Sequence, residues 1–250
     1  MTGIVLRYIF FLSLVFLASC KKEELSSNSL ELTLVLRHQS MGKKLAEARQ
    51  VHDSSGHTLA FSRFQYYLSN VSFIGQNSAD TYEVPVRYFL IKALNDSGET
   101  RIIIPNFPLR SYRAIRMHIG LDSIANSGLN GTGALDPGNG MYWPWSKEYK
   151  FMVMEGRFQR DDVGGSFLYH IAGNPCYRKI EIPLTDGKEA PLKFREGSRL
   201  ILNSEVSALF GAPNRVDFQT FNDVTTLETG AGKIADNYSS GSFMKLAGLE

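Results

Sequence analysis

Residues 30–36 read Leu30-Glu31-Leu32-Thr33-Leu34-Val35-Leu36, with a leucine at every second position. Successive side chains of a β-strand point to opposite faces, so this period of two predicts an extended segment with one apolar face. The same alternation recurs at 64–68 and at 115–121. The chain is therefore expected to be built from strands that bury one face.

Further β-rich runs follow along the chain, separated by turn residues such as those at 95–98 and 136–140. The runs cover 84–91, 101–104, 149–154, 166–171, 178–184 and 200–206. Helical patterns are confined to 41–49, 207–210 and 227–237. About ten short strands punctuated by turns predict an all-β fold, an antiparallel β-sandwich with few short helices. No repeat or linker interrupts 30–250, which is expected to form one domain.

The N-terminus has the organisation of an export signal. Arg7 precedes an apolar run at 8–17, which is shorter than the roughly 20 residues of a membrane-spanning helix but suits a signal peptide. Leu17-Ala18-Ser19-Cys20 resembles the bacterial lipobox, in which cleavage exposes the cysteine for lipid attachment. We expect a signal peptide at 1–19, and a lipidated Cys20 with a flexible tether at 20–29. The protein would then be anchored to a membrane of the bacterial cell envelope. An ordinary signal peptide that ends near a cysteine is the alternative.

Charge and cysteine content exclude some classes of protein. Without Arg7, the only charged residue of the predicted signal peptide, 26 of the 27 basic residues remain against 25 acidic ones. No basic stripe follows the tether, so nucleic-acid binding is not expected. With Cys20 lipidated, Cys176 is the only remaining thiol, which excludes a disulfide framework; it is expected to be a buried apolar residue.

The familiar enzyme signatures are absent from the sequence. It contains no Gly-x-Ser-x-Gly elbow, no His-Glu-x-x-His helix, no phosphate-binding glycine loop and no Cys-x-x-Cys pair. No other acid–base or nucleophile constellation is visible, so the protein is not expected to be an enzyme.

The five histidines differ in their expected surroundings. His38 continues the even-numbered series of the first strand, so it is expected to point inward and either to be hydrogen-bonded or to bind a metal. His170 lies in a segment that is apolar on both faces and is expected to be partly buried. His118 shares a polar face with Arg116, while His52 and His57 flank a turn; all three are expected at the surface.

Trp143 and Trp145 are two positions apart, so in an extended segment they share one face. Pro144 between them lacks the N–H that a central strand needs, which favours an edge strand or a loop. Two indoles on one face are typical of core anchors or of an aromatic platform for carbohydrate.

Five segments together resemble the family of MbnP-like copper-binding proteins. The tryptophan block is the longest and most specific of them, and the segments follow one another in the family's order. They are 61–71 (FSRFQYYLSNV), 119–126 (IGLDSIAN), 135–145 (LDPGNGMYWPW), 149–156 (YKFMVMEG) and 167–173 (FLYHIAG), the last with Ala172 where the family has glycine.

This resemblance implies an exported bacterial β-sandwich that binds copper for acquisition, storage or delivery. It further implies a partner enzyme of the diheme cytochrome c peroxidase type, which oxidises a tryptophan to kynurenine. Trp143 and Trp145 are the candidates for oxidation. His38 and His170 are the expected copper ligands, with His52 in reserve, because imidazole nitrogens suit copper.

A different class of function fits the same sequence. The chain could be a metal-free binding lipoprotein of the cell envelope, whose Trp143/Trp145 face recognises a glycan or another protein. Convergence of two histidines near a tryptophan would favour copper, and its absence would favour this alternative.

Overall fold

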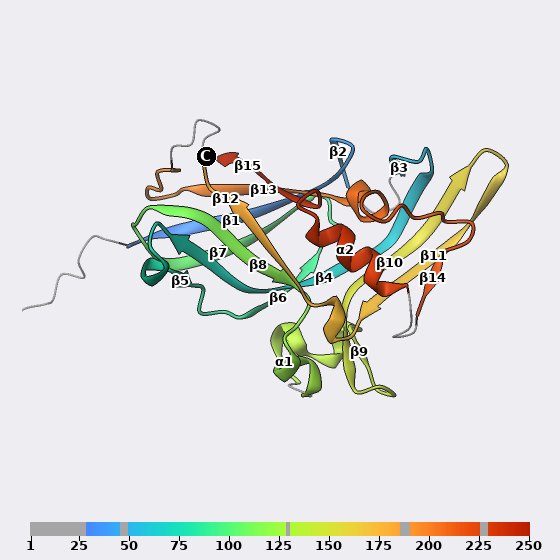
Figure 1. The fold of residues 1–250 in the computed structure, drawn as a ribbon, viewed down its shortest axis with the longest axis horizontal. Coiled ribbons are helices and arrows are strands. Elements are labelled where there is room, and N and C mark those ends of the chain that lie inside the picture. The colour runs from blue at the N-terminus through green and yellow to red at the C-terminus, as the bar shows by residue number, and fades with distance from the viewer. Residues whose placement is uncertain (1–28, 46–49, 129–130, 186–190, 226–229) are drawn as a thin grey trace, which may run out of the picture.

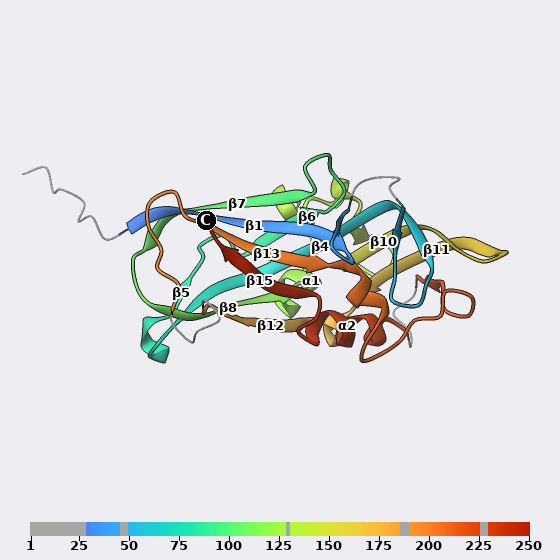
Figure 2. The ribbon, with the colours of Figure 1, turned by 90° about the horizontal axis from the view of Figure 1, so that it is seen from above.

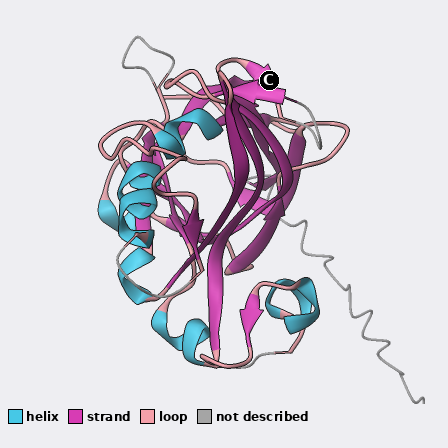
Figure 3. Cartoon of the chain, turned by 90° about the vertical axis from the view of Figure 1, so that its right-hand side faces the viewer, coloured by secondary structure: helices cyan, strands magenta, loops and turns pink. Residues whose placement is uncertain are grey.

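The computed structural model describes residues 29–45, 50–128, 131–185, 191–225 and 230–250. Its strands form two sheets that face each other across one apolar core (Figures 1 and 2). Viewed end-on, the helices lie along one side of the strands and below them (Figure 3). The predicted signal peptide and Cys20 lie outside the described residues. In the part that is described, no helix is long and apolar enough to cross a membrane.

The smaller sheet, sheet A, is centred on β1. This strand pairs with β13 on one side and with β7 and β2 on the other, and β15 extends the sheet beyond β13. Its members are β1 (Ser29–Ser40), β2 (Lys43–Lys44), β7 (Glu99–Pro108), β13 (Arg199–Glu205) and β15 (Met244–Leu249).

The larger sheet, sheet B, is organised by β4, the longest described strand. β10 and β8 pair with successive parts of β4 along one edge, while β3, β6 and β5 follow its other edge. The strands are β3 (Gln50–His52), β4 (Thr58–Gly75), β5 (Tyr82–Glu83), β6 (Tyr88–Lys92), β8 (Tyr112–Ile119), β9 (Tyr142–Trp143, paired with β10), β10 (Glu148–Arg160), β11 (Val163–Ala172), β12 (Arg178–Pro183) and β14 (Asp223–Val224).

The alternation seen in the sequence decides which side chains form the core. Leu32, Leu34 and Leu36 of β1 are fully buried, and across the core so are Phe64 and Tyr66 of β4. The odd-numbered residues between them on β4 therefore point to the outer face of sheet B. This outer face carries the polar groups described below.

A β-bulge at Asn70 reverses this alternation, as an earlier register shift between Phe61 and Arg63 also does. Asn70 has a φ of 48°, and the pairing of β4 with β8 shifts register between Ser69 and Ser72. After the bulge the odd-numbered Val71 and Phe73 are buried, because one extra residue reverses which positions face the core. Ser72 consequently lies on the outer face, together with Arg63 and Gln65, which precede the bulge.

The predicted β-sandwich is confirmed, with two differences in detail. β1 pairs with β13 in parallel, and β11 pairs with β14 in parallel. In both cases a long connection separates the partners along the chain, so the tight hairpin that imposes antiparallel pairing is absent.

The helices are short and few, as expected. They are α1 (Ser123–Ser127), α2 (Ala231–Ser239) and the 3-10 helices η1 (Ser78–Asp80), η2 (Gly133–Leu135), η3 (Pro137–Asn139), η4 (Asn174–Cys176) and η5 (Val206–Phe210). The helix predicted at 41–49 is wrong at Lys43–Lys44, which form β2, and 46–49 lie outside the described residues. The helix predicted at 227–237 is found as α2 at 231–239, while 227–229 lie outside the described residues.

The connection from β8 to β10 carries α1, η2, η3 and β9 and packs against the outer face of sheet B (Figure 1). Tyr67 of β4 donates a hydrogen bond to the carbonyl of Ala134 at 3.0 Å. The predicted tight loop at 136–140 is confirmed: the Asp136 carboxylate accepts from the Gly138 N–H at 2.8 Å, and Gly140 closes the turn with a φ of 73°. This loop delivers β9 and its tryptophan to the surface of the sheet.

Candidate tryptophan–histidine site

Trp143 and Trp145 stack on each other in the hairpin that joins β9 to β10. Their ring centroids are 5.2 Å apart. Trp143 pairs with Glu148 and is 7% exposed, whereas Trp145 lies in the turn and is 66% exposed. The prediction that they share one face of an extended segment is not met, because the strand ends at Trp143; the two rings instead meet through the turn, with Trp143 buried and Trp145 exposed.

His170 brings an imidazole to the buried indole. It lies on β11, next to Val153 of β10, and its ring centroid is 6.1 Å from that of Trp143. Its side chain is 14% exposed, so the predicted partial burial is found. A strand residue and a hairpin residue thus meet on the outer face of sheet B.

A carboxylate orients this imidazole. Nε2 of His170 is 2.9 Å from Oε1 of Glu155, and the same oxygen is 3.5 Å from Nη1 of Arg63. Burial is the main cause that lowers the pKa of His170; Lys150 and Arg63 add to this effect, while the hydrogen bond to Glu155 opposes it. A neutral His170 therefore donates Nε2–H to Glu155, which leaves Nδ1 with a free lone pair.

Arg63 also fastens the loop that precedes the tryptophans. Its Nη2 donates to the carbonyl oxygens of Asn139 at 3.3 Å and Gly140 at 3.2 Å, and to Oε1 of Gln65 at 3.0 Å. Because Arg63 contacts both Glu155 and this loop, one side chain fixes the position of β9 relative to β10 and β11.

Lys150 completes the surroundings of Trp143. It is 7% exposed, and its Nζ lies 5.9 Å from the centre of the indole ring, within reach of a cation–π interaction. Burial is the first cause that lowers its pKa, followed by the charge of Arg63, and Glu155 acts in the opposite direction.

The structure does not bring His38 to this site. His38 is buried, as its parity predicted, and its ring packs edge-on to Tyr66 at 6.2 Å, on the core side of sheet B. His170 pairs with Val153, which pairs with Gln65, the neighbour of Tyr66 on β4. Adjacent residues of a strand point to opposite faces, so the two histidines lie on opposite sides of the sheet.

His38 is instead part of the core. Its Nε2 lies 3.0 Å from Oγ1 of Thr100, and burial lowers its pKa to about 4. An imidazole that stays neutral in the core needs a hydrogen-bond partner rather than a counter-charge, and Thr100 supplies one.

The remaining histidines are also distant from the tryptophans in the fold. His52, the reserve ligand, is exposed on β3, with Nδ1 3.2 Å from Oγ1 of Thr58. The expected surface position of His57 is wrong: its ring is buried, and Nδ1 lies 2.9 Å from Oδ2 of Asp53. His118 is half-buried rather than solvated, because it stacks on Tyr177.

Sequence analysis did not single out Arg63, Lys150 or Glu155. Arg63 and Glu155 are direct partners in the pairing of β4 with β10, and both interrupt runs of apolar residues. A charged residue in the middle of each strand was a sign of a polar site in the sequence. Only the pairing of the two strands shows that the opposite charges lie together. Among the described residues, no three side chains of His, Cys, Asp or Glu converge as a ready metal site.

These features define a class: a two-sheet β-sandwich that carries a buried tryptophan and a carboxylate-oriented histidine on the outside of one sheet. The sequence profile of the MbnP family matches residues 29–227. The chain therefore belongs to the MbnP family.

A solved structure shows the same fold. It is described as MbnP from Methylosinus trichosporium and matches this protein with a TM-score of 0.53 at 10% sequence identity, over 83% of this chain and 87% of the other. At that identity the likeness establishes the shared fold. No curated protein matches the chain in a sequence search.

Proposed function

We propose that this protein is a lipid-anchored copper-binding protein of the bacterial cell envelope, and that copper binds beside Trp143 and His170. The observation that carries the proposal is the contact of these two rings at 6.1 Å, in a chain of the MbnP family. Copper acquisition, storage or delivery is the role that follows, and no catalytic step is required of the protein.

The chemistry of His170 suits a metal ligand. Histidines that bind metals commonly donate their second ring N–H to a carboxylate, which fixes the tautomer and the orientation of the ring. Glu155 occupies this position at 2.9 Å from Nε2. The neutral ring then offers Nδ1, and imidazole nitrogen is a favoured copper donor.

The unmodified site has too few donors for a tight copper complex. An indole nitrogen carries a proton and has no lone pair to give, so Trp143 is a poor ligand as it stands. Oxidation of Trp143 to kynurenine opens the indole and supplies an aromatic amine and a carbonyl oxygen beside His170. This explains why a tryptophan is placed where a ligand would be expected.

Trp143 is the better of the two candidates for oxidation. It is the indole that contacts His170, while Trp145 is 66% exposed and lies over it from the solvent side. The oxidant would be a partner enzyme of the diheme cytochrome c peroxidase type, which would approach from the side of Trp145.

The test compares protein made with and without such a diheme enzyme from the native host. Intact mass reports the conversion of tryptophan to kynurenine, and metal analysis reports copper. We expect copper bound in a one-to-one ratio only when the mass change is present, and neither signal in Trp143→Phe. A mass change that persists in Trp143→Phe and disappears in Trp145→Phe would show that Trp145, not Trp143, is oxidised, and would contradict the proposal. Equal copper binding by modified and unmodified protein would overturn the proposal.

A metal-free function is the second candidate. Two observations favour it: among the described residues His170 is the only histidine with a ring contact to a tryptophan, so the expected convergence of two histidines is not found, and Trp145 is exposed. An indole that is 66% exposed and stacked on a second indole is a ready contact for a sugar ring or a protein side chain. In this case Trp145→Ala would abolish binding of the partner, while His170→Ala would leave it unchanged.

A further inference from the structure

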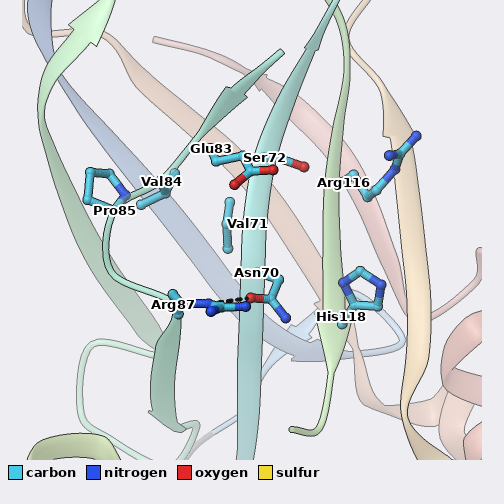
Figure 4. Close-up of a pocket in the computed structure, with 9 residues that line it drawn as sticks. All are labelled: Asn70, Val71, Ser72, Glu83, Val84, Pro85, Arg87, Arg116 and His118. Atoms are coloured by element: carbon cyan, nitrogen blue, oxygen red, sulfur yellow. Dashed lines mark hydrogen bonds between the residues drawn. The ribbon is translucent and has the colours of Figure 1, made fainter. Parts of the chain in front are cut away.

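A second concave site lies on the outer face of sheet B, away from the tryptophans. It is a pocket of about 500 Å³ between β8 and the segment that leads from β5 to β6 (Figure 4). Its polar lining consists of Asn70, Ser72, Glu83, Arg87, Arg116 and His118. The volume falls in the range of roughly 300–1,000 Å³ that is typical of small-molecule sites.

The bulge in β4 shapes this pocket. Asn70 adopts a left-handed conformation with a φ of 48° in the middle of a long strand. Two backbone hydrogen bonds hold the opposite wall beside the bulge, from Asn70 N–H to the Arg87 carbonyl at 2.8 Å and from Val84 N–H to the Val71 carbonyl at 2.9 Å. Bulges and left-handed residues other than glycine are concentrated at functional sites, where they re-aim side chains.

Strand pairing aligns the polar groups in one row. Ser72 pairs with Glu83 on one side and with Arg116 on the other, and Arg116 in turn pairs with Glu181 of β12. Paired residues point to the same face of a sheet, so the four side chains cross the outer face side by side. His118 is two residues after Arg116 on β8 and lies on the same face.

Contacts beneath the row hold these groups in place. Arg87 Nε donates to Oδ1 of Asn70 at 3.2 Å (Figure 4), and Asn70 Nδ2 donates to the hydroxyl of Tyr177 at 2.7 Å. The Tyr177 ring stacks on His118, with centroids 4.7 Å apart and planes 12° apart. The Tyr88 hydroxyl donates to Asp122 at 2.8 Å, at the edge of the same network. The lining is therefore fixed before any ligand arrives.

Both arginines of the lining have carboxylate partners within the protein. Arg116 lies 2.9 Å from Glu181, which also pairs with Arg113 at 3.4 Å, and Arg87 lies 3.7 Å from Asp122. Glu83 has no ion-pair partner among the described residues, and Lys179 supplies one further positive charge next to His118. Burial, followed by the charges of Arg116 and Lys179, lowers the pKa of His118, while Asp122 acts in the opposite direction, so the neutral ring is favoured. Neither lining arginine is therefore an unpaired cation for an anionic ligand, whereas the Glu83 carboxylate can accept hydrogen bonds from hydroxyl groups.

We propose that this pocket binds a neutral polyhydroxylated ligand, a saccharide or a fragment of a glycan. The guanidinium groups of Arg87 and Arg116 are donors, the Glu83 carboxylate is an acceptor, and the Ser72 hydroxyl can act as either. A hydroxyl group donates and accepts at once, so a ligand bearing several hydroxyls satisfies both kinds of wall group without displacing the ion pairs of the two arginines. This site does not depend on copper or on Trp143.

The test measures saccharide binding to the full chain by saturation-transfer NMR, in a detergent without a sugar headgroup. The probes are glucose, galactose, mannose, N-acetylglucosamine, maltose and cellobiose, with glucuronate and citrate as anionic comparators. The variants are Glu83→Gln, which removes the charge and keeps the size of the side chain, and Arg87→Gln, which removes the charge and shortens it. The matched control is Glu31→Gln, an exposed strand glutamate of sheet A.

At least one neutral saccharide is expected to bind, with an affinity about tenfold weaker in each pocket variant, because each loses a charge-assisted hydrogen bond. Glu31→Gln is expected to bind as the unaltered protein does. The proposal is overturned if no neutral probe binds up to about 50 mM, where a millimolar site would be nearly full. It is equally overturned if only glucuronate or citrate binds, or if both pocket variants retain full affinity. Binding that is lost in Trp145→Ala but kept in Glu83→Gln would place the saccharide on the tryptophan face and refute the pocket.

Discussion

Nε2 of His170 and Oε1 of Glu155 lie 2.9 Å apart on neighbouring strands, and this pair sets the orientation of the imidazole beside Trp143. The two residues are not opposite each other in the ladder, because Glu155 pairs with Leu168 and His170 with Val153. They meet diagonally on the outer face of sheet B, where long side chains can bridge such positions.

Removing the imidazole should weaken copper binding by the modified protein. We expect His170→Ala, isolated after coexpression with the diheme partner, to bind copper more than about tenfold more weakly, because a ligand nitrogen is missing. Glu155→Gln should lose about tenfold, the lower end of what the removal of an outer partner costs. Copper titration followed by metal analysis measures both.

The matched control for these variants is His52→Ala, because His52 is exposed on β3 and makes only a 3.2 Å contact with Thr58. Unchanged affinity is expected there. If His52→Ala weakened copper binding as much as His170→Ala, binding would be a property of surface histidines in general.

His38 should make the stability of the protein depend on pH. Its pKa is about 4 in the folded state, because of burial, against about 6.5 in the unfolded chain. Between these pH values the unfolded chain therefore binds more protons than the folded protein. The contribution of the neutral His38 to the free energy of unfolding is fully present above pH 6.5 and is lost as the pH falls towards 4. The loss amounts to about 3 kcal/mol.

Chemical denaturation at several pH values tests this prediction. His38→Gln keeps an amide that can hydrogen-bond Thr100 but cannot titrate, so its stability curve should be flatter than that of the unaltered protein between pH 6.5 and 4. His52→Gln should follow the unaltered protein. Parallel curves for His38→Gln and the unaltered protein would contradict the burial argument.

Gly156 should tolerate no side chain. A Cβ at this position would lie 2.3 Å from the carbonyl oxygen of Ala60 and 2.7 Å from the ring of Phe167. Gly156→Ala is expected to lower the free energy of unfolding by about 1–3 kcal/mol, as overpacking does. Thermal or denaturant unfolding gives the value.

Gly232→Ala serves as the control for Gly156. Gly232 lies in α2, and a Cβ there would have no atom within 4 Å. Alanine is favoured over glycine inside a helix, so this variant should gain about 0.5–1 kcal/mol. Similar losses in both variants would show that the close contact at Gly156 is not the cause.

Cys20 should decide where the protein is found in the cell. The segment Leu17-Ala18-Ser19-Cys20 predicts lipid attachment, and the acyl chains supply membrane affinity of about 0.8 kcal/mol per buried methylene. Cys20→Ser should abolish incorporation of labelled fatty acid and release the protein from the membrane fraction. Retention in the membrane without label would show that the anchor is elsewhere.

The sequence predicted the β-sandwich well because local alternation carries the necessary information. In β1 the buried leucines follow directly from a period of two, and the inward position of His38 follows from the same parity. Whether a residue has an even or odd number within its strand does not show which face of the other sheet its side chain contacts. His38 reaches Tyr66 from the core, whereas His170 lies behind the sheet, and this depends on how β10 pairs with β4 and β11.

The errors at other histidines have similar causes. His57 was expected at the surface because it follows a turn, but the turn folds inward and Asp53 accepts its Nδ1–H in the interior. His118 was placed on a solvated face, although Tyr177, far along the chain, covers it. In both cases the rings that cover the histidine come from distant parts of the chain, Phe158 and Phe218 for His57 and Tyr177 for His118, and no local pattern encodes them.

The bulge at Asn70 links the length of one strand to both sites on the outer face of sheet B. Arg63 lies before it at the tryptophan site, and Ser72 lies after it in the pocket. Loss or gain of a single residue between these two positions would turn the side chains of one site into the core while the other kept its face. An insertion or deletion in this stretch should therefore damage one of the two sites, even where a substitution is harmless. The residues of each site can change, but the number of residues between the sites must stay the same.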